Sequence, residues 1–185
     1  MIRNRRAQAW RFCFGNRTKL ANGMERGMQS TIDPMRGHDI EVVARLRIAA
    51  FFEGTGRTLE EDAAGLRNLL TSDGLETALV ARVNDVPVGT CLLVRHELEP
   101  AHDLTPWLAG LVVDAGHRGK GTGTALVRAI EAHAASAGVE ILYLYTWEAR
   151  TFYKALGWEA VEVCEQDGEP MMLMSRRLAQ SFPKR

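Results

Sequence analysis

A glycine-rich turn with two cationic side chains lies mid-chain, between an apolar stretch and an amphipathic one. The stretch Trp107 to Val113 is wholly apolar, and the turn behind it places Arg118 and Lys120 beside three glycines within five residues. Glycines at the start of a helix let a ligand approach the backbone closely, and the first helical amides have no intrahelical partner. The helix dipole and the two cations add to the attraction for anions. We therefore predict that this turn binds a phosphate or a pyrophosphate.

Two common phosphate-binding motifs do not fit the spacing of this turn. A P-loop needs a glycine five residues before its Gly-Lys pair and a serine or threonine after it, but Asp114 and Gly121 occupy those positions. A dinucleotide fingerprint needs a third glycine where Thr124 stands. The remaining alternative is a turn that merely joins a strand to a helix, and the two cations argue against it.

Hydrophobic periodicity predicts a mixed α/β order around the turn. Thr58 and Glu61 form a capping box that predicts a helix start. Strands are expected at 29–32, 77–83, 88–96, 107–113, 140–146, 158–164 and 171–177, and helices at 39–52, 59–70, 126–137 and 149–156. The order β-α-α-β-β-β-α-β-α-β-β predicts a single-domain mixed β-sheet flanked by helices, of the α/β class.

Length, composition and charge exclude several classes of protein. The 185 residues suit one domain, and 46% hydrophobic residues argue against a disordered chain. No charge-free run approaches the roughly 20 residues that span a bilayer. Three widely spaced cysteines predict neither a disulfide framework nor a metal site, and they favour a reducing, cytoplasmic location. A net charge of zero gives no general case for a nucleic-acid or membrane partner.

The charge is unevenly distributed along the chain. Residues 1–27 carry seven basic residues and one acidic one, which leaves the rest of the chain with a net charge of −6. We expect residues 1–27 to be a disordered leader, or to precede a true start at Met28 or Met24. A transit peptide, or a basic arm that binds nucleic acid or acidic lipid, is the alternative. The folded domain is expected at residues 28–180.

Two segments resemble motifs of the GNAT family of N-acetyltransferases. Residues 118–123, Arg-Gly-Lys-Gly-Thr-Gly, match the family signature Arg/Gln-x-x-Gly-x-Gly/Ala. Residues 152–158, Phe-Tyr-Lys-Ala-Leu-Gly-Trp, resemble its Tyr-x-x-x-Gly-Phe/Trp segment. The motifs occur in the family's order, and the resemblance covers about residues 29–178. It implies a GNAT-like (acyl-CoA N-acyltransferase) fold and an enzyme that transfers acetyl from acetyl-CoA to a primary amine in a ternary complex.

The resemblance also implies roles for individual residues. The strand would pair its backbone with the pantetheine arm, and one amide there would polarise the thioester carbonyl. Tyr153 matches the tyrosine that protonates the departing thiolate, although a core tyrosine is the alternative. Acetyl-CoA acts as a cosubstrate, and no metal is implied. The implied cofactor-binding residues are Leu111, Val112, Val113, Arg118, Gly119, Lys120, Gly121, Thr122, Gly123 and Thr124.

The general base, the acyl group and the acceptor each have more than one candidate. The strand at 107–113 has no ionisable side chain, so the base is His102, Asp103, Glu53 or a water molecule. The missing carboxylate also motivates an alternative function, a non-catalytic acyl-CoA-binding sensor of the same fold. The alternatives include a longer acyl group in place of acetyl, and a homodimer in place of a monomer. The acceptor is expected to be a small-molecule or peptide amine, and the charge of −6 favours a cationic one.

Overall fold

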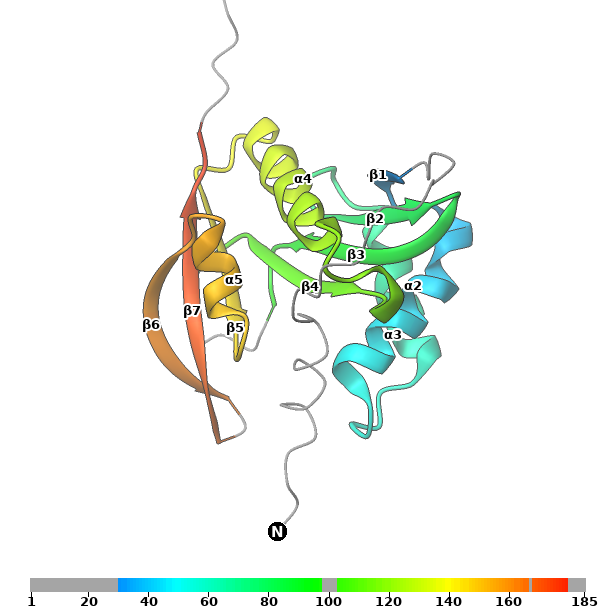
Figure 1. Ribbon diagram of the computed structural model, residues 1–185, viewed down its shortest axis with the longest axis horizontal. Helices are drawn as coiled ribbons and strands as arrows, with labels where there is room; N and C mark the ends of the chain where they lie inside the picture. Colours follow the sequence, from blue (N-terminus) through cyan, green and yellow to red (C-terminus); the bar gives the residue numbers. More distant parts are fainter. Residues whose placement is uncertain (1–29, 98–102, 167, 180–185) are drawn as a thin grey trace, which may run out of the picture.

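The computed structural model describes residues 30–97, 103–166 and 168–179, and its elements follow the order expected from the sequence (Figure 1). The expected leader at 1–27 lies outside the described residues. The strands are β1 (Ser30–Pro34), β2 (Thr77–Val83), β3 (Val86–Val94), β4 (Trp107–Val113), β5 (Ile141–Thr146), β6 (Glu159–Gln166) and β7 (Glu169–Arg177). The helices are η1 (Gly37–Asp39), α2 (Ile40–Arg47), η2 (Ile48–Phe52), α3 (Leu59–Leu69), η3 (Ala115–His117), α4 (Thr122–Ser136) and α5 (Arg150–Ala155).

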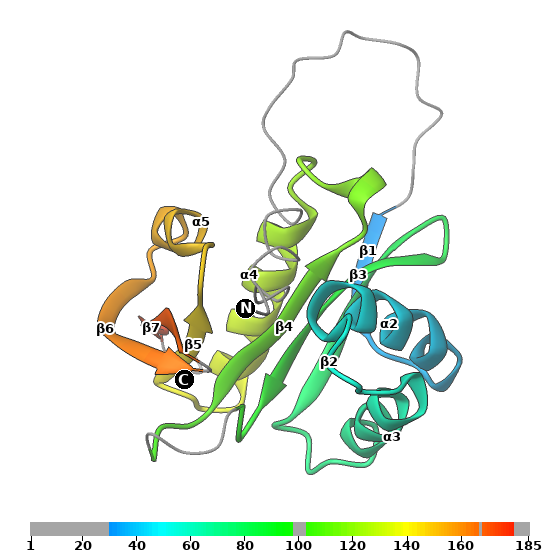
Figure 2. The same cartoon turned by 90° about the horizontal axis from the view of Figure 1, so that it is seen from below.

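The strands form one mixed sheet in the order β1-β2-β3-β4-β5-β7-β6. All neighbouring strands are antiparallel except β4 and β5, which are parallel. Figure 2 shows α4 on one side of β2–β4, and α2 and α3 on the other. Each side has its own buried apolar cluster, and α4, α5, β5 and β7 contribute to the larger one. The predicted single-domain mixed sheet flanked by helices is therefore confirmed.

The hairpin between β2 and β3 is tighter than predicted. Its turn consists of two residues, Asn84 and Asp85, with φ angles of 51° and 64°. Two left-handed residues are typical of the type I′ turn, whose twist matches that of the flanking strands. The strand therefore begins at Val86 and includes Pro87, whereas the sequence pattern placed Pro87 in the turn. A register shift next to Arg82 accommodates the proline.

The predicted helix at 39–52 is present but changes its winding near its end. Regular α-helix continues to Arg47, and Ile48–Phe52 form a wider π-helical turn. Such turns often occur next to functional sites. The following helix begins with the predicted capping box, in which the Glu61 amide donates to Thr58 Oγ1 (3.2 Å) and the Thr58 amide donates to Glu61 (2.8 Å).

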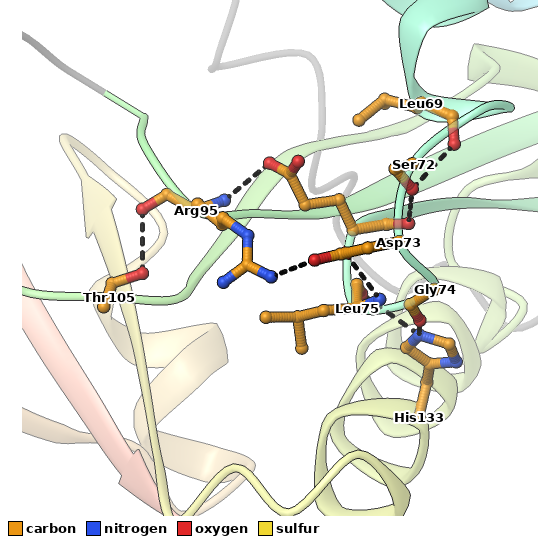
Figure 3. A network of polar contacts seen from close by, with 9 residues as sticks. Leu69, Ser72, Asp73, Gly74, Leu75, Arg95, Thr105 and His133 are labelled. Carbon is orange, nitrogen blue, oxygen red and sulfur yellow. Dashed lines mark hydrogen bonds and ion pairs between the residues drawn. The ribbon is translucent and has the colours of Figure 1, made fainter.

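A polar network joins the loop before β2 to the ends of other elements (Figure 3). The Arg95 amide donates to Glu76 (2.8 Å), and the Arg95 guanidinium pairs with Asp73. Thr105, just before β4, donates its hydroxyl to the Arg95 carbonyl (3.0 Å). On α4, His133 Nε2 lies 3.1 Å from the carbonyl of Gly74. These bonds fix where β3 ends and where β4 begins.

Among the helices found in residues 30–97, 103–166 and 168–179, none is long and apolar enough to cross a membrane. In the same ranges, no three histidine, cysteine, aspartate or glutamate side chains gather closely enough to hold a metal ion.

Candidate active site

The parallel strands β4 and β5 separate soon after they meet (Figure 2). They pair only at Trp107 and Tyr143, where the Tyr143 amide donates to the Pro106 carbonyl (3.1 Å). The Trp107 ring stacks on Tyr145 at 4.7 Å and closes this end. Within the described residues, β4 has no further strand pairing on that side. The backbone of the predicted residues Leu111, Val112 and Val113 therefore lies along an edge that an extended ligand can pair with.

Gly110 forms a bulge in the middle of β4. Its φ is +57°, and the β3–β4 register shifts between Thr90 and Leu92, so Cys91 faces the extra residue. A left-handed residue in a strand favours glycine, and a bulge re-aims the backbone groups beside it. The sequence reasoning missed this feature. The signal was an isolated glycine inside an otherwise apolar strand.

The glycine-rich turn connects the end of β4 to the first turn of α4. Gly121 caps the helix with φ +87°, and the first bond of the helical ladder runs from the Ala125 amide to the Gly121 carbonyl (3.0 Å). The amides of residues 122–124 therefore precede the ladder. Arg118 Nε donates to the Val113 carbonyl (2.8 Å), which holds this cation beside the strand end. The structure thus brings together all the predicted turn residues, from Arg118 to Thr124.

Asp114 and His117 contact each other just before the glycine-rich turn. Asp114 accepts from the Gly116 amide (3.0 Å) and contacts His117 Nδ1 (3.2 Å). The hydrogen bond from His117, helped by that amide, lowers the pKa of Asp114 below its ordinary value. His117 therefore has a structural partner in the turn.

Tyr153 lies on α5, within the apolar cluster shared with α4. Its side chain is 2% exposed, and its ring packs against Phe152 (5.0 Å) and Trp158 (5.9 Å). Trp158 is fixed in turn, because its indole N–H donates to Glu131 of α4 (2.9 Å). A Cβ atom on Gly123 would lie 3.8 Å from the Phe152 ring, so α5 contacts the first turn of α4. The two motifs are therefore neighbours in space.

A model of the acetyltransferase (GNAT) family matches residues 41–158 of the sequence. The chain belongs to this family. The matched residues include both motifs and the two strands that separate, β4 and β5. It makes the protein a GNAT acetyltransferase, as the sequence motifs predicted.

Solved structures show the same GNAT fold at low sequence identity. An N-acetyltransferase from Staphylococcus aureus Mu50 has a TM-score of 0.67 at 16% identity, over 82% of this chain and 99% of that one. The yncA protein of Salmonella typhimurium, solved with its cofactor acetyl-CoA, gives 0.65 at 16%, over 84% and 98%. An aminoglycoside 6'-N-acetyltransferase complexed with coenzyme A gives 0.65 at 19%, over 84% and 99%. A comparison with curated proteins finds no significant match.

The predicted base candidates of this GNAT protein are dispersed. Glu53 follows the π-helical turn η2 and is exposed. Asp103 is exposed in the segment before β4, and His102 lies outside the described residues. No geometric observation selects one of them.

The side of the sheet covered by α2 and α3 carries a charge cluster that the sequence reasoning missed. Arg47 donates to Asp62 through Nε (2.9 Å) and Nη2 (3.3 Å), and Arg57 Nη2 lies 3.2 Å from the same carboxylate. The Asp62 side chain is fully buried, and both guanidinium groups lie over the Phe52 ring. A Cβ atom on Gly110 would overlap Arg47 Nη1. The cluster therefore touches the bulge of β4.

A signal for this cluster was present in the helical spacing. Arg47 lies three residues after the buried Ala44, and Asp62 lies four residues before the buried Leu66. Charged residues at positions that face a core are rarely buried unless they are paired. The two therefore had to find partners inside the protein.

Glu97 adds a further carboxyl group near the cluster. Its side chain is exposed, yet burial of the carboxyl raises its pKa to about 7, against the lowering effect of Arg47 and Arg57. The group is therefore within reach of solvent while protein surrounds it. No sequence pattern indicated this, because Glu97 stands in a polar stretch without hydrophobic periodicity.

Proposed function

We propose that the protein transfers the acetyl group of acetyl-CoA to a primary amine by direct attack in a ternary complex. The observation that carries this proposal is the edge of β4 from the Gly110 bulge to the glycine-rich turn, which pairs with no further strand among the described residues. The residues fit the cosubstrate, because a Cβ atom at Gly119 or Gly121 would meet nothing within 4 Å and the turn is open to a ligand. When bound, acetyl-CoA supplies an activated acetyl carbon.

The binding roles follow from the position of each group. The amides of residues 122–124, together with Arg118 and Lys120, would hold the pyrophosphate at the start of α4. The backbone of residues 111–113 would pair with the extended arm of the cosubstrate. A backbone amide next to the bulge would polarise the carbonyl oxygen, where negative charge develops during attack.

Two proton transfers complete the proposed reaction. Tyr153 donates the phenol proton to the departing sulfur. The attacking amine must lose a proton, and to the alternatives Glu53, Asp103, His102 and water we add Glu97. A carboxyl whose pKa is raised to about 7 is well matched to proton transfer at neutral pH. We expect a small-molecule or peptide amine as acceptor, a cytoplasmic location, and either a monomer or a homodimer.

An acetyl-transfer assay over a panel of amines tests this function. The full chain is incubated with acetyl-CoA and each amine, and the released thiol is measured. Calorimetry with coenzyme A runs in parallel. We expect thiol release that depends on the amine, together with coenzyme A binding. Absence of coenzyme A binding would overturn the proposal, whereas binding without transfer to any amine would favour the alternative, a non-catalytic acyl-CoA sensor. Longer acyl-CoA esters in the same assay define the acyl group.

A further inference from the structure

The charge cluster of Arg47, Asp62 and Arg57 lies where an acceptor would meet the acetyl group. Arg47 Nη1 lies directly against Gly110, the bulge at the end of the proposed cosubstrate edge. The cluster is on the side of the sheet covered by α2 and α3, opposite α4. An amine that approaches the acetyl group from this side therefore passes beside two guanidinium groups.

The cluster holds more positive charge than its buried carboxylate neutralises. Two guanidinium groups share Asp62, and Asp62 uses both oxygens in these contacts. The Arg57 side chain is 39% exposed, so it keeps N–H donors that a ligand can reach. Phe52 lies 4.5 Å from the Arg57 guanidinium carbon and limits the directions in which that side chain can point. The pair is thus an oriented donor surface beside the bulge.

Arginine side chains in a fixed orientation are well suited to carboxylate recognition. The planar fork of donors matches the two oxygens of a carboxylate, and charge-assisted hydrogen bonds are stronger than neutral ones. In an α-amino acid, a single carbon separates the amine from the carboxylate. A carboxylate bound at Arg47 and Arg57 would therefore hold the amine close to the bulge.

We propose that the acceptor is an α-amino acid whose carboxylate is bound by Arg57 and Arg47 beside Gly110. The proposal rests on the proposed acetyl transfer and names its substrate class. A polyamine fits this site poorly, since each further ammonium group would be repelled by the two guanidinium groups. The local charge thus outweighs the domain charge of −6, which favoured a cationic acceptor.

Matched pairs of acceptors test the proposal. The full chain is assayed with leucine, glutamate and phenylalanine, with the α-carboxamide of each, and with spermidine. We expect kcat/KM for each acid to exceed that for its carboxamide about tenfold or more. The variant Arg57→Gln should lower this ratio about tenfold, mainly through KM for the acid. Arg67→Gln is the matched control, because Arg67 is exposed on α3 and pairs with Glu60, away from the cluster.

The outcomes separate this proposal from the proposed function. A preference for carboxamides or spermidine, or an acid-to-carboxamide ratio that Arg57→Gln leaves unchanged, overturns the acceptor class while acetyl transfer stands. Absence of transfer to every amine overturns both. Arg57→Lys adds a readout that a purely structural role would not give. It keeps the charge but loses the planar fork, so its acid-to-carboxamide ratio should lie between those of the wild type and Arg57→Gln. Melting temperatures of the variants show that each is folded.

Discussion

On the α4 side of the sheet, Arg118 and Lys120 stand at a turn built from glycines, whereas Arg47 and Arg57 on the α2–α3 side are held by one buried carboxylate. The Arg118 side chain donates to the Val113 carbonyl, and the Lys120 side chain is exposed. Arg47 is fixed by two bonds to Asp62, a fully buried group. Cations on a glycine-rich turn suit a flexible polyphosphate, while cations fixed by a buried carboxylate can select an acceptor by its shape.

The two regions also differ in what they contribute to stability. Removing one partner of a buried ion pair costs about 3–5 kcal/mol, because the other charge is left buried and unpaired. An exposed ion pair contributes only about 0–1 kcal/mol. Changes on the acceptor side should therefore affect folding, whereas changes in the glycine-rich turn should affect mainly cosubstrate binding.

The largest effect is expected for Gly110→Ala. Alanine needs space that Arg47 Nη1 occupies, so the buried pair with Asp62 must move, and the φ of +57° adds strain. We expect a loss of about 2–5 kcal/mol in the free energy of unfolding, measured by urea denaturation, because overpacking costs about 1–3 kcal/mol and the left-handed conformation about 1–2 kcal/mol. Gly54→Ala is the matched control. Its φ is +74° with nothing within 4 Å, so only about 1–2 kcal/mol should be lost. Equal losses in the two variants would contradict the packing of Arg47 on the bulge.

The second prediction concerns the chemistry on the α4 side. Tyr153→Phe keeps the ring between Phe152 and Trp158 but removes the phenol proton. We expect kcat to fall about 100-fold or more, because general acid catalysis is lost. Calorimetry should show coenzyme A affinity close to that of the wild type. An unchanged kcat would leave Tyr153 with only its role in the core.

The contrast between the two regions also explains what the sequence could predict. The glycine-rich turn, the Tyr153 helix and the order of elements are local patterns, and the structure confirms their positions. The link from Arg47 to Asp62 spans two helices, and the contact with Gly110 adds a strand. Such contacts depend on how α2 and α3 pack on the sheet, which periodicity alone does not specify. The predicted start of the second hairpin strand was wrong for a simpler reason, because Asn84 and Asp85 turn the chain before Pro87.

A smaller effect is expected for Lys120→Gln in the turn. The loss of one exposed cation near the pyrophosphate should raise KM for acetyl-CoA about fivefold, which corresponds to about 1 kcal/mol. Because salt screens exposed charges, the difference from the wild type should shrink at 0.5 M NaCl, with about a 4 Å Debye length. Arg45→Gln, which removes an exposed cation of α2 that pairs with Glu41, is the control and should leave KM unchanged. A difference that persists at high salt would contradict a simple electrostatic role.

The smallest effect concerns the acceptor side and its pH dependence. Burial raises the pKa of Glu97 from its ordinary 4.5 to about 7 in the folded protein. The folded state then holds this proton at pH values where the unfolded chain has released it. Its contribution to stability is full below pH 4.5 and is lost as the pH rises through about 7. Between pH 5 and pH 8 the wild type should therefore lose more stability than Glu97→Gln, which cannot ionise.

Melting temperatures of both proteins at pH 5, 6, 7 and 8 measure this difference. The gap should be modest, because the Glu97 side chain is exposed and solvent screens part of the interaction. If the melting temperatures of the two proteins changed equally with pH, solvent would stabilise the Glu97 carboxylate as it does in an unfolded chain. In that case Glu97 would be an ordinary surface carboxyl, and the acceptor side would keep its fixed arginine pair. The acceptor side would then be defined by the Asp62 cluster alone.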